Sequence, residues 1–364
     1  MKIKDILKDL ESWAPPAYQE SYDNSGLLVG DKNNDLTGAM ISLDVTMEVI
    51  DEAIAKKCNL IVAHHPLIFR GIKKLVPGHW VNDCLLKAIK NDIAIYAIHT
   101  NLDNISGGVN WQIGNKIGLE NLSILSPKAD SLQKLVTFIP KDYTQKVLDA
   151  VHKAGAGRIG NYDNSSFSHD GTGTFRPNEN ANPAIGERGK VERVEETRIE
   201  VLVPIQKSGQ IISALEEAHP YEVVAHYLQP LNNLNQDVGS GAIGELPSKM
   251  DFQSFIALLK SSMSLEVIKC TKPVKSELKS VAVCGGSGSF LLPAAKRAKA
   301  DVFITSDFKY HEFFEAEDQI TIMDIGHYES EVFTKDLIAD RLRENFANIA
   351  LHLSQVVTNP IKYL

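Results

Sequence analysis

The chain has 364 residues, of which 43% are hydrophobic and 23% are charged, and this balance excludes a disordered protein, a collagen and a coiled coil. At about 150 residues per domain, the length predicts two or three domains. The net charge of −8 disfavours the phosphate backbone of nucleic acid as the main partner.

The first third of the chain alternates helical and strand patterns with short connections. In chain order, the predicted elements are a helix over 3–13, a strand over 38–45, a helix over 46–57, a strand over 59–63, a helix over 80–90 and a strand over 93–98. Strands that alternate with helices in this way predict βαβ units and a mainly parallel sheet.

The middle of the chain has a different pattern. Its predicted elements are a strand over 135–139, a helix over 141–154, strands over 166–175 and 198–203, a helix over 206–218 and a strand over 222–230. This βαββαβ order is typical of a ferredoxin-like α+β module. We expect the module to be inserted into a loop of the surrounding protein, with boundaries near Pro127 and Leu246.

The last third returns to the α/β pattern. Its predicted elements are a strand over 280–284, a helix over 290–299, a strand over 301–305, a helix over 310–317, a strand over 319–325, a helix over 329–345 and a strand over 349–353. The expected fold class is therefore α/β, with two similar halves that form one core and an α+β insertion between them. The expected domains are residues 1–126, 127–246 and 247–364.

No apolar run approaches the roughly 18–20 residues that span a bilayer, and the start of the chain lacks the pattern of a secretion signal. The four cysteines, Cys58, Cys84, Cys270 and Cys284, show no CxxC spacing and lie in apolar surroundings. Both features favour a reduced, cytoplasmic protein without a membrane partner.

Three clusters of imidazole and carboxylate side chains follow predicted strands. They are His64-His65, His99 with Asp103, and the run from His327 to Glu331. Ligands bind at the carboxyl ends of strands in parallel sheets, so the three clusters are expected to face one crevice. Neutral imidazole and carboxylate are ligands of zinc, iron and manganese.

The spacing of these residues favours two ions over one. His327 and Glu331 are four residues apart, which places them on one face of a helix. His64 and His65 diverge from an extended backbone, so they would address two ions better than one. A shared carboxylate could then bridge two metals about 3.5–4 Å apart.

Each of these residues also has a plainer interpretation. A single histidine after a strand is more often a capping or core residue than a ligand. Asp44 and Asp307 follow predicted strands, and for both we favour capping of the next helix. The run Gly285-Gly286-Ser287-Gly288 could hold an anion at a helix N-terminus, but it lacks the spacing of a dinucleotide fingerprint.

His311 is the predicted catalytic residue. It follows the predicted strand over 301–305 and could face the crevice as a base, or pack at the start of a short helix. A hydrolase that opens a ring must deliver a proton to the leaving nitrogen, and a histidine that binds no metal can supply it.

Five motifs occur in order along the whole chain: Asp23-Asn24-Ser25-Gly26-Leu27, Ala63-His64-His65-Pro66, His99-Thr100-Asn101-Leu102-Asp103, Gly285-Gly286-Ser287-Gly288 and Asp324-Ile325-Gly326-His327-Tyr328-Glu329-Ser330-Glu331. Together they resemble the GTP cyclohydrolase I type 2 family, also called the Ngg-interacting-factor-three-like family. The middle module resembles the insertion of some bacterial members, which is similar to the PII and CutA proteins. His219-Pro220-Tyr221-Glu222-Val223 looks like a CutA motif.

The resemblance implies a dinuclear metal site with two divalent ions per chain, of zinc, iron or manganese. The implied ligands are His64, His65, Asp103, His327 and Glu331, with Glu331 as the bridging ligand. The resemblance also implies a ring-shaped homohexamer with its metal sites facing an inner cavity, and hydrolysis of the purine ring of GTP.

The leading functional hypothesis is a metal-dependent hydrolase that acts on a nucleotide-like or other cyclic amide substrate. An alternative is a non-enzymatic regulatory ring protein, in which the metals order the fold and the middle module senses a small ligand or partner. A third is a ring that encloses nucleic acid, against which the net charge of −8 argues.

Overall fold

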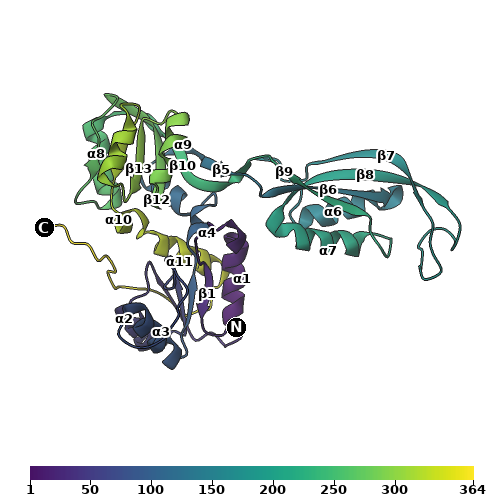
Figure 1. The fold of residues 1–364 in the computed structure, drawn as a ribbon, viewed down its shortest axis with the longest axis horizontal. Coiled ribbons are helices and arrows are strands. Elements are labelled where there is room, and N and C mark those ends of the chain that lie inside the picture. The colour runs from purple at the N-terminus through teal and green to yellow at the C-terminus, as the bar shows by residue number, and fades with distance from the viewer. The chain divides into compact units, whose positions relative to one another are not determined.

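The computed structural model describes residues 1–364, which divide into two units. Unit 1 combines Met1–Ser126 with Val238–Leu364, and unit 2 is Pro127–Asp237. Figure 1 labels many of the helices and strands of both units. None of the helices combines the length and the apolar character that a membrane crossing requires.

The first sheet of unit 1 has five strands and is mainly parallel. In spatial order these strands are β1 (Gly26–Val29), β4 (Ala94–Ala97), β3 (Leu60–Ala63), β2 (Ala39–Ser42) and β15 (Leu351–Leu353). Only β1 runs antiparallel to its neighbour, β4. Every residue of β2, β3 and β4 is buried, as expected for parallel strands that helices cover on both faces.

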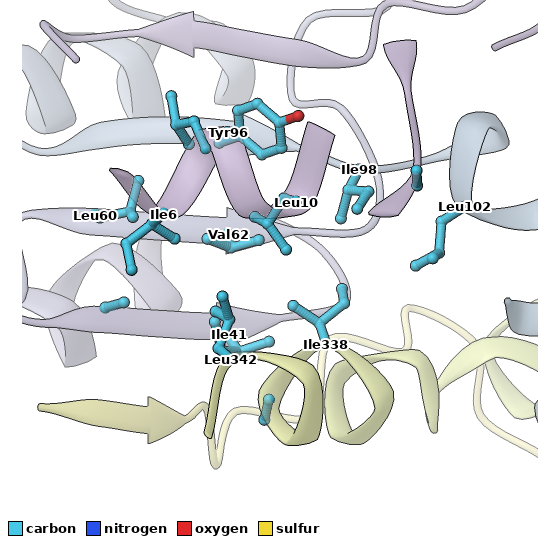
Figure 2. Close-up of a cluster of buried hydrophobic side chains, with 14 of the residues drawn as sticks. Ile6, Leu10, Ile41, Leu60, Val62, Tyr96, Ile98, Leu102, Ile338 and Leu342 are labelled. Atoms are coloured by element: carbon cyan, nitrogen blue, oxygen red, sulfur yellow. The ribbon is translucent and has the colours of Figure 1, made fainter. Parts of the chain in front are cut away.

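Helices cover both faces of this sheet. They are α1 (Ile3–Trp13) and α11 (Thr334–Asn345) on one face, and α2 (Met47–Ala55) and α3 (Trp80–Lys90) on the other. Figure 2 shows the first core, in which Leu10 of α1 and Ile338 of α11 join Ile41 of β2 in one buried cluster. Neighbouring side chains of a strand point to opposite faces, so Met40 of β2 belongs to the second core.

The placement of the last helix and strand corrects a prediction. The patterns over 329–345 and 349–353 were expected to complete the second half of the core. Instead, α11 packs on the first sheet and Leu351–Leu353 pairs in parallel with Ala39–Ile41 of β2. An amphipathic pattern specifies which face of a helix is buried, but not the sheet on which that face packs.

The second sheet of unit 1 has six strands. In spatial order they are β11 (Lys269–Cys270), β14 (Thr321–Asp324), β13 (Val302–Ser306), β12 (Glu277–Ser287), β10 (Asn235–Asp251) and β5 (Glu120–Lys128). The three strands β12, β13 and β14 are parallel, and β10 and β11 run antiparallel to their partners. Separate buried clusters join this sheet to α5 (Val109–Lys116) and α8 (Phe252–Met263), and to α9 (Leu292–Arg297).

Unit 2 is an antiparallel sheet covered on one face by two helices. The strands in spatial order are β7 (Ser166–Phe175), β8 (Glu192–Pro204), β6 (Leu132–Pro140) and β9 (His226–Leu231), and the helices are α6 (Thr144–Lys153) and α7 (Ser208–Ala218). Leu135 and Ile199 of the sheet form a buried cluster with Val147 of α6 and Leu215 of α7. The unit therefore has a hydrophobic core of its own.

Candidate metal centre

The candidate site is built from residues that follow three strand ends of unit 1. His64 and His65 come directly after β3, while His99 comes two residues after β4 and is followed by α4 (Thr100–Asp103). In the second sheet, α10 (His327–Glu331) begins three residues after β14. Residues that follow strands of both sheets therefore lie together in one site.

The first group of donor atoms consists of His64, Asp103 and Glu331. His64 Nε2 lies 3.6 Å from Asp103 Oδ1 and 3.8 Å from Glu331 Oε1. Both His64 Nε2 and Asp103 Oδ1 are buried without a hydrogen-bond partner. Buried polar atoms without partners are rare in folded proteins, so two that converge on a carboxylate indicate a place for a cation.

The second group consists of His65, His327 and Glu331. Glu331 Oε2 lies 2.9 Å from His65 Nε2 and 3.0 Å from His327 Nε2. Each carboxylate oxygen of Glu331 therefore faces a different group. Within each group the donor atoms lie within 4.8 Å of one another, so each group could hold a metal ion.

Hydrogen bonds at Nδ1 fix how His64 and His65 present their other nitrogen. His64 Nδ1 lies 2.8 Å from the carbonyl oxygen of Ile98, and His65 Nδ1 lies 2.7 Å from Asp44 Oδ1. Carbonyl and carboxylate oxygens only accept, so each Nδ1 carries the hydrogen and donates it. The Nε2 lone pairs are left directed into the site, as metal ligands require.

His327 and His99 are held in the same way. His327 Nδ1 donates to Asp307 Oδ2 at 2.6 Å, and His99 Nδ1 donates to Asp23 Oδ1 at 2.8 Å. The ligand nitrogen of His99 lies within 4.8 Å of those of His64 and His65. His99 is thus a fourth imidazole at the site, outside the ligand set that the family resemblance implied.

The electrostatics of the site favour positive charge. Burial lowers the pKa of His65, but Asp44 and Glu331 outweigh it and raise the pKa to about 9. Burial also lowers the pKa of His327, but the carboxylates of Asp307 and Glu331 outweigh burial and raise this pKa to about 11. Burial also raises the pKa of Asp103 above its ordinary value. Excess negative charge at the imidazoles is the condition under which a cation, proton or metal, binds there.

Gly286 makes room for Glu331. Its φ is +61°, and a Cβ at this position would lie 2.4 Å from Glu331 Oε1. The N–H of Gly286 donates to Ser330 Oγ at 3.0 Å, and that of Gly285 donates to Asn110 Oδ1 at 2.9 Å. These two amide hydrogens are used inside the protein, so the role of this glycine run is close approach of the backbone rather than an open anion cradle.

A cavity of about 850 Å³ opens above the donor groups. Its wall carries the exposed aromatic side chains of Phe69, Trp80 and Phe290, together with Arg70. This combination of aromatic rings and a few charged groups is typical of a site for a small molecule.

The structure does not bring His311 to this cavity. His311 is exposed in the 3-10 helix η5 (Tyr310–Ala316), and its ring contacts Tyr310 and Phe314 at centroid distances of 5.2 and 6.3 Å. Its catalytic role remains a prediction from the sequence. The five predicted metal ligands, in contrast, lie together.

The sequence predicts helix capping for two site residues, Asp44 and Asp307, and the structure corrects both predictions. The N-cap of α2 is Thr46, whose hydroxyl accepts from the N–H of Val49, while Asp44 binds His65. The N-cap of η5 is Lys309, while Asp307 binds His327. Asp44 and Asp307 each follow a strand that pairs in parallel with a strand followed by a histidine of the site. The sequence could have identified these two acids as histidine partners only if the strand order had been known.

The fold and the site together define a class of protein. It is a mixed α/β protein with several sheets and a buried histidine–carboxylate site that could hold metal. The chain belongs to the Duf34/NIF3 (NGG1p interacting factor 3) family, which matches residues 1–360.

Relatives match the chain over its whole length. A Halalkalibacterium halodurans protein named GTP cyclohydrolase 1 type 2 homolog is 36% identical over 372 residues, covering 100% of both chains. A Bacillus subtilis protein of the same name is 35% identical over 366 residues, covering 99% of this chain and 98% of the relative. The crystal structure of a Bacillus cereus protein related to NIF3 has a TM-score of 0.89 and 37% identity, covering 100% of this chain and 99% of that chain.

Proposed function

We propose that the two donor groups form a dinuclear centre for divalent ions of zinc, iron or manganese. His64 and Asp103 would hold one ion, His65 and His327 the other, and Glu331 would bridge them. The observation that carries this proposal is the division of the Glu331 carboxylate, with Oε1 on the His64 side and Oε2 on the side of His65 and His327. The partnerless His64 Nε2 and Asp103 Oδ1 support it.

The proposed activity is hydrolysis of a nucleotide-like or other cyclic amide substrate, with purine ring opening of GTP as one member of that class. Two ions at the centre would supply Lewis acidity and lower the pKa of water. Phe69, Trp80 and Phe290 would stack on a planar ring, and the Arg70 guanidinium would pair with a phosphate or carboxylate. His99, fixed by Asp23, would present Nε2 to a polar atom of the substrate.

Metal analysis combined with a hydrolysis screen tests this proposal. Purified protein is expected to carry close to two divalent ions per chain and to hydrolyse at least one nucleotide or cyclic amide only when metal is present. Glu331→Gln is expected to lose both ions, because a bridging ligand serves two. Glu344→Gln, at an exposed position of α11 and outside both donor groups, is the matched control. Full metal content in Glu331→Gln would contradict the bridging role.

A non-enzymatic regulatory protein is the second candidate function, and the second cavity of the chain favours it. This cavity, of about 620 Å³, lies in unit 2 and is lined by the buried Glu196, by Arg198 and by Tyr221. Tyr221 Oη donates to Glu196 Oε1 at 3.0 Å. Metal binding without turnover of any substrate, together with a ligand for this cavity, would favour the regulatory function.

Three further features of the protein are proposed from the sequence and the family resemblance. We propose, within the sequence domains 1–126, 127–246 and 247–364, that the middle one contains a ferredoxin-like module of the PII and CutA kind, whose compact part is Pro127–Asp237. The flanking segments would form two similar α/β halves, the second of which contributes α11 and β15 to the first sheet. A ring-shaped homohexamer is the proposed assembly, which sedimentation velocity would test. A cytoplasmic location is supported by the four cysteines, which form no disulfide.

A further inference from the structure

The segment after β15 contributes Asn359, Pro360 and Ile361 to the lining of the metal-site cavity and is joined to both sheets of unit 1. Ser354 Oγ donates to Glu52 Oε2 on α2 at 2.6 Å, beside the first sheet. Asn359 Nδ2 donates to Glu329 Oε1 on α10 at 2.9 Å, beside the second sheet. Residues 354–361 form neither helix nor strand, and we call them the strap. The strap therefore spans the two sheets that supply the ligands.

The strap also reaches the metal centre through one hydroxyl. Thr358 Oγ1 donates to Asp44 Oδ2 at 2.5 Å. The other oxygen of that carboxylate, Oδ1, accepts from His65 Nδ1 at 2.7 Å, and His65 Nε2 lies 2.9 Å from Glu331 Oε2. Two hydrogen bonds and one close nitrogen–oxygen contact thus connect the strap to the proposed bridging ligand.

We propose that Thr358 is a positioning residue of the metal centre, which acts through Asp44 to fix the His65 imidazole with Nε2 directed at Glu331. This inference rests on the proposed dinuclear site. A carboxylate held at one oxygen only can rotate about its Cβ–Cγ bond, and its histidine partner then loses a fixed orientation. Hydrogen-bonded partners behind metal ligands typically contribute 10–100-fold in metal affinity.

The exposure of Asp44 sets the size of the expected loss in metal affinity, and the hydrogen bonds of Asp44 determine which ion is affected. The Asp44 side chain is 33% exposed, so water can replace part of the lost hydrogen bond, and we expect the lower end of that range. Asp44 binds His65, which belongs only to the group of His65, His327 and Glu331. The group of His64, Asp103 and Glu331 shares Glu331, but its imidazole is fixed by the Ile98 carbonyl, and this group is expected to keep its affinity.

Calorimetric titration of metal-free protein with Zn²⁺ tests the proposal without any assay of activity. Thr358→Val keeps the shape of the side chain and removes the hydroxyl. This variant is expected to bind one of the two ions with about tenfold lower affinity, and the other with an affinity within about twofold of that of the parent protein. Thr358→Ser keeps the hydroxyl and is expected to match the parent. Val357→Ala, at the exposed neighbouring position, is the control and is also expected to match the parent.

A double-mutant cycle separates positioning from a general effect on the fold. In the background of Asp44→Ala, Thr358→Val is expected to have no further effect, because the hydroxyl acts only through that carboxylate. Additive losses would overturn the proposal, as would equal losses of both ions in Thr358→Val and Thr358→Ser. Parent-like binding of two ions by Thr358→Val would overturn this inference alone. A parent protein that binds fewer than two ions would instead overturn the dinuclear site on which it rests.

Discussion

Single residues decide whether the Glu331 carboxylate can lie between the imidazoles. Burial by itself would raise the pKa of Glu331, but His327, His64 and His65 outweigh that effect and hold it well below the ordinary value. The ionised carboxylate is therefore the stable form at neutral pH. It also needs space, and that space exists because residue 286 has no Cβ.

Gly286→Ala is expected to remove metal binding at both donor groups. The added Cβ would lie 2.4 Å from Glu331 Oε1, and the φ of +61° is unfavourable for alanine. We also expect a loss of about 1–3 kcal/mol in the free energy of unfolding. Metal content after gel filtration and urea denaturation measure the two effects. Gly71→Ala is the control, because a Cβ there meets no atom within 4 Å. Normal metal content in Gly286→Ala would contradict the requirement for close approach.

His311→Ala is expected to leave metal content unchanged and to alter the free energy of unfolding by no more than about 0.5 kcal/mol. The reason is its exposed position and its contacts, which join it to Tyr310 and Phe314 rather than to the donor groups. Metal analysis and thermal unfolding check this outcome. A loss of hydrolysis with intact metal content would instead support the catalytic role that the sequence predicted.

At the scale of elements, Asp301 anchors the start of β13 in the second sheet. Its carboxylate accepts from Lys275 Nζ and from the backbone N–H groups of Lys279 and Ser280. Burial alone would raise the pKa of Asp301, but these donors outweigh burial and hold it below the ordinary value. The ionised carboxylate thus joins β13 to β12 and to the segment that precedes it.

The stability of the protein should therefore depend on Asp301 in a pH-dependent way. Its folded pKa is depressed, so the stabilisation is present above the unfolded value of about 3.9 and is lost as pH falls toward the folded pKa. Asp301→Asn is expected to lower the free energy of unfolding by about 1–3 kcal/mol at pH 7. Urea denaturation at pH 7 and below pH 4 should show this difference shrinking with acid. Asp318→Asn, at an exposed position, is the control and should show no such trend.

For the molecule as a whole, unit 2 enters and leaves unit 1 through adjacent strands. Ser126 lies in β5 and Val238 lies in β10, which are neighbours in the six-stranded sheet. None of the donor residues of the metal centre lies between them. Unit 2 can therefore be removed without separating the ligands along the chain.

Replacing residues 127–237 by a short Gly/Ser linker is expected to leave a folded protein that binds metal. The adjacent strand ends need only a hairpin connection, and each unit has its own buried cores. Circular dichroism and metal analysis measure the outcome. Aggregation together with loss of metal would show that unit 2 is an integral part of the core.

Local patterns in the sequence were sufficient for many elements and for the clusters that contain the candidate ligands. The apolar run over 59–63 predicted a buried strand, and β3 spans Leu60–Ala63. The helix predicted over 80–90 is α3, Trp80–Lys90. The His64-His65 pair that follows this strand could be singled out as a candidate from the sequence, and the family resemblance then implied its role as a ligand pair.

The tertiary structure alone decided which distant residues meet. His65 and Glu331 are 266 residues apart in the chain, and Thr358 and Asp44 are 314 apart. The amphipathic pattern of α11 likewise did not identify the first sheet as its partner. Periodicity reports which face of an element is buried, because that depends on the element itself. Contacts between elements depend on strand order and packing, and these fixed the partners of each histidine, the separation of the two donor groups and the exposed position of His311.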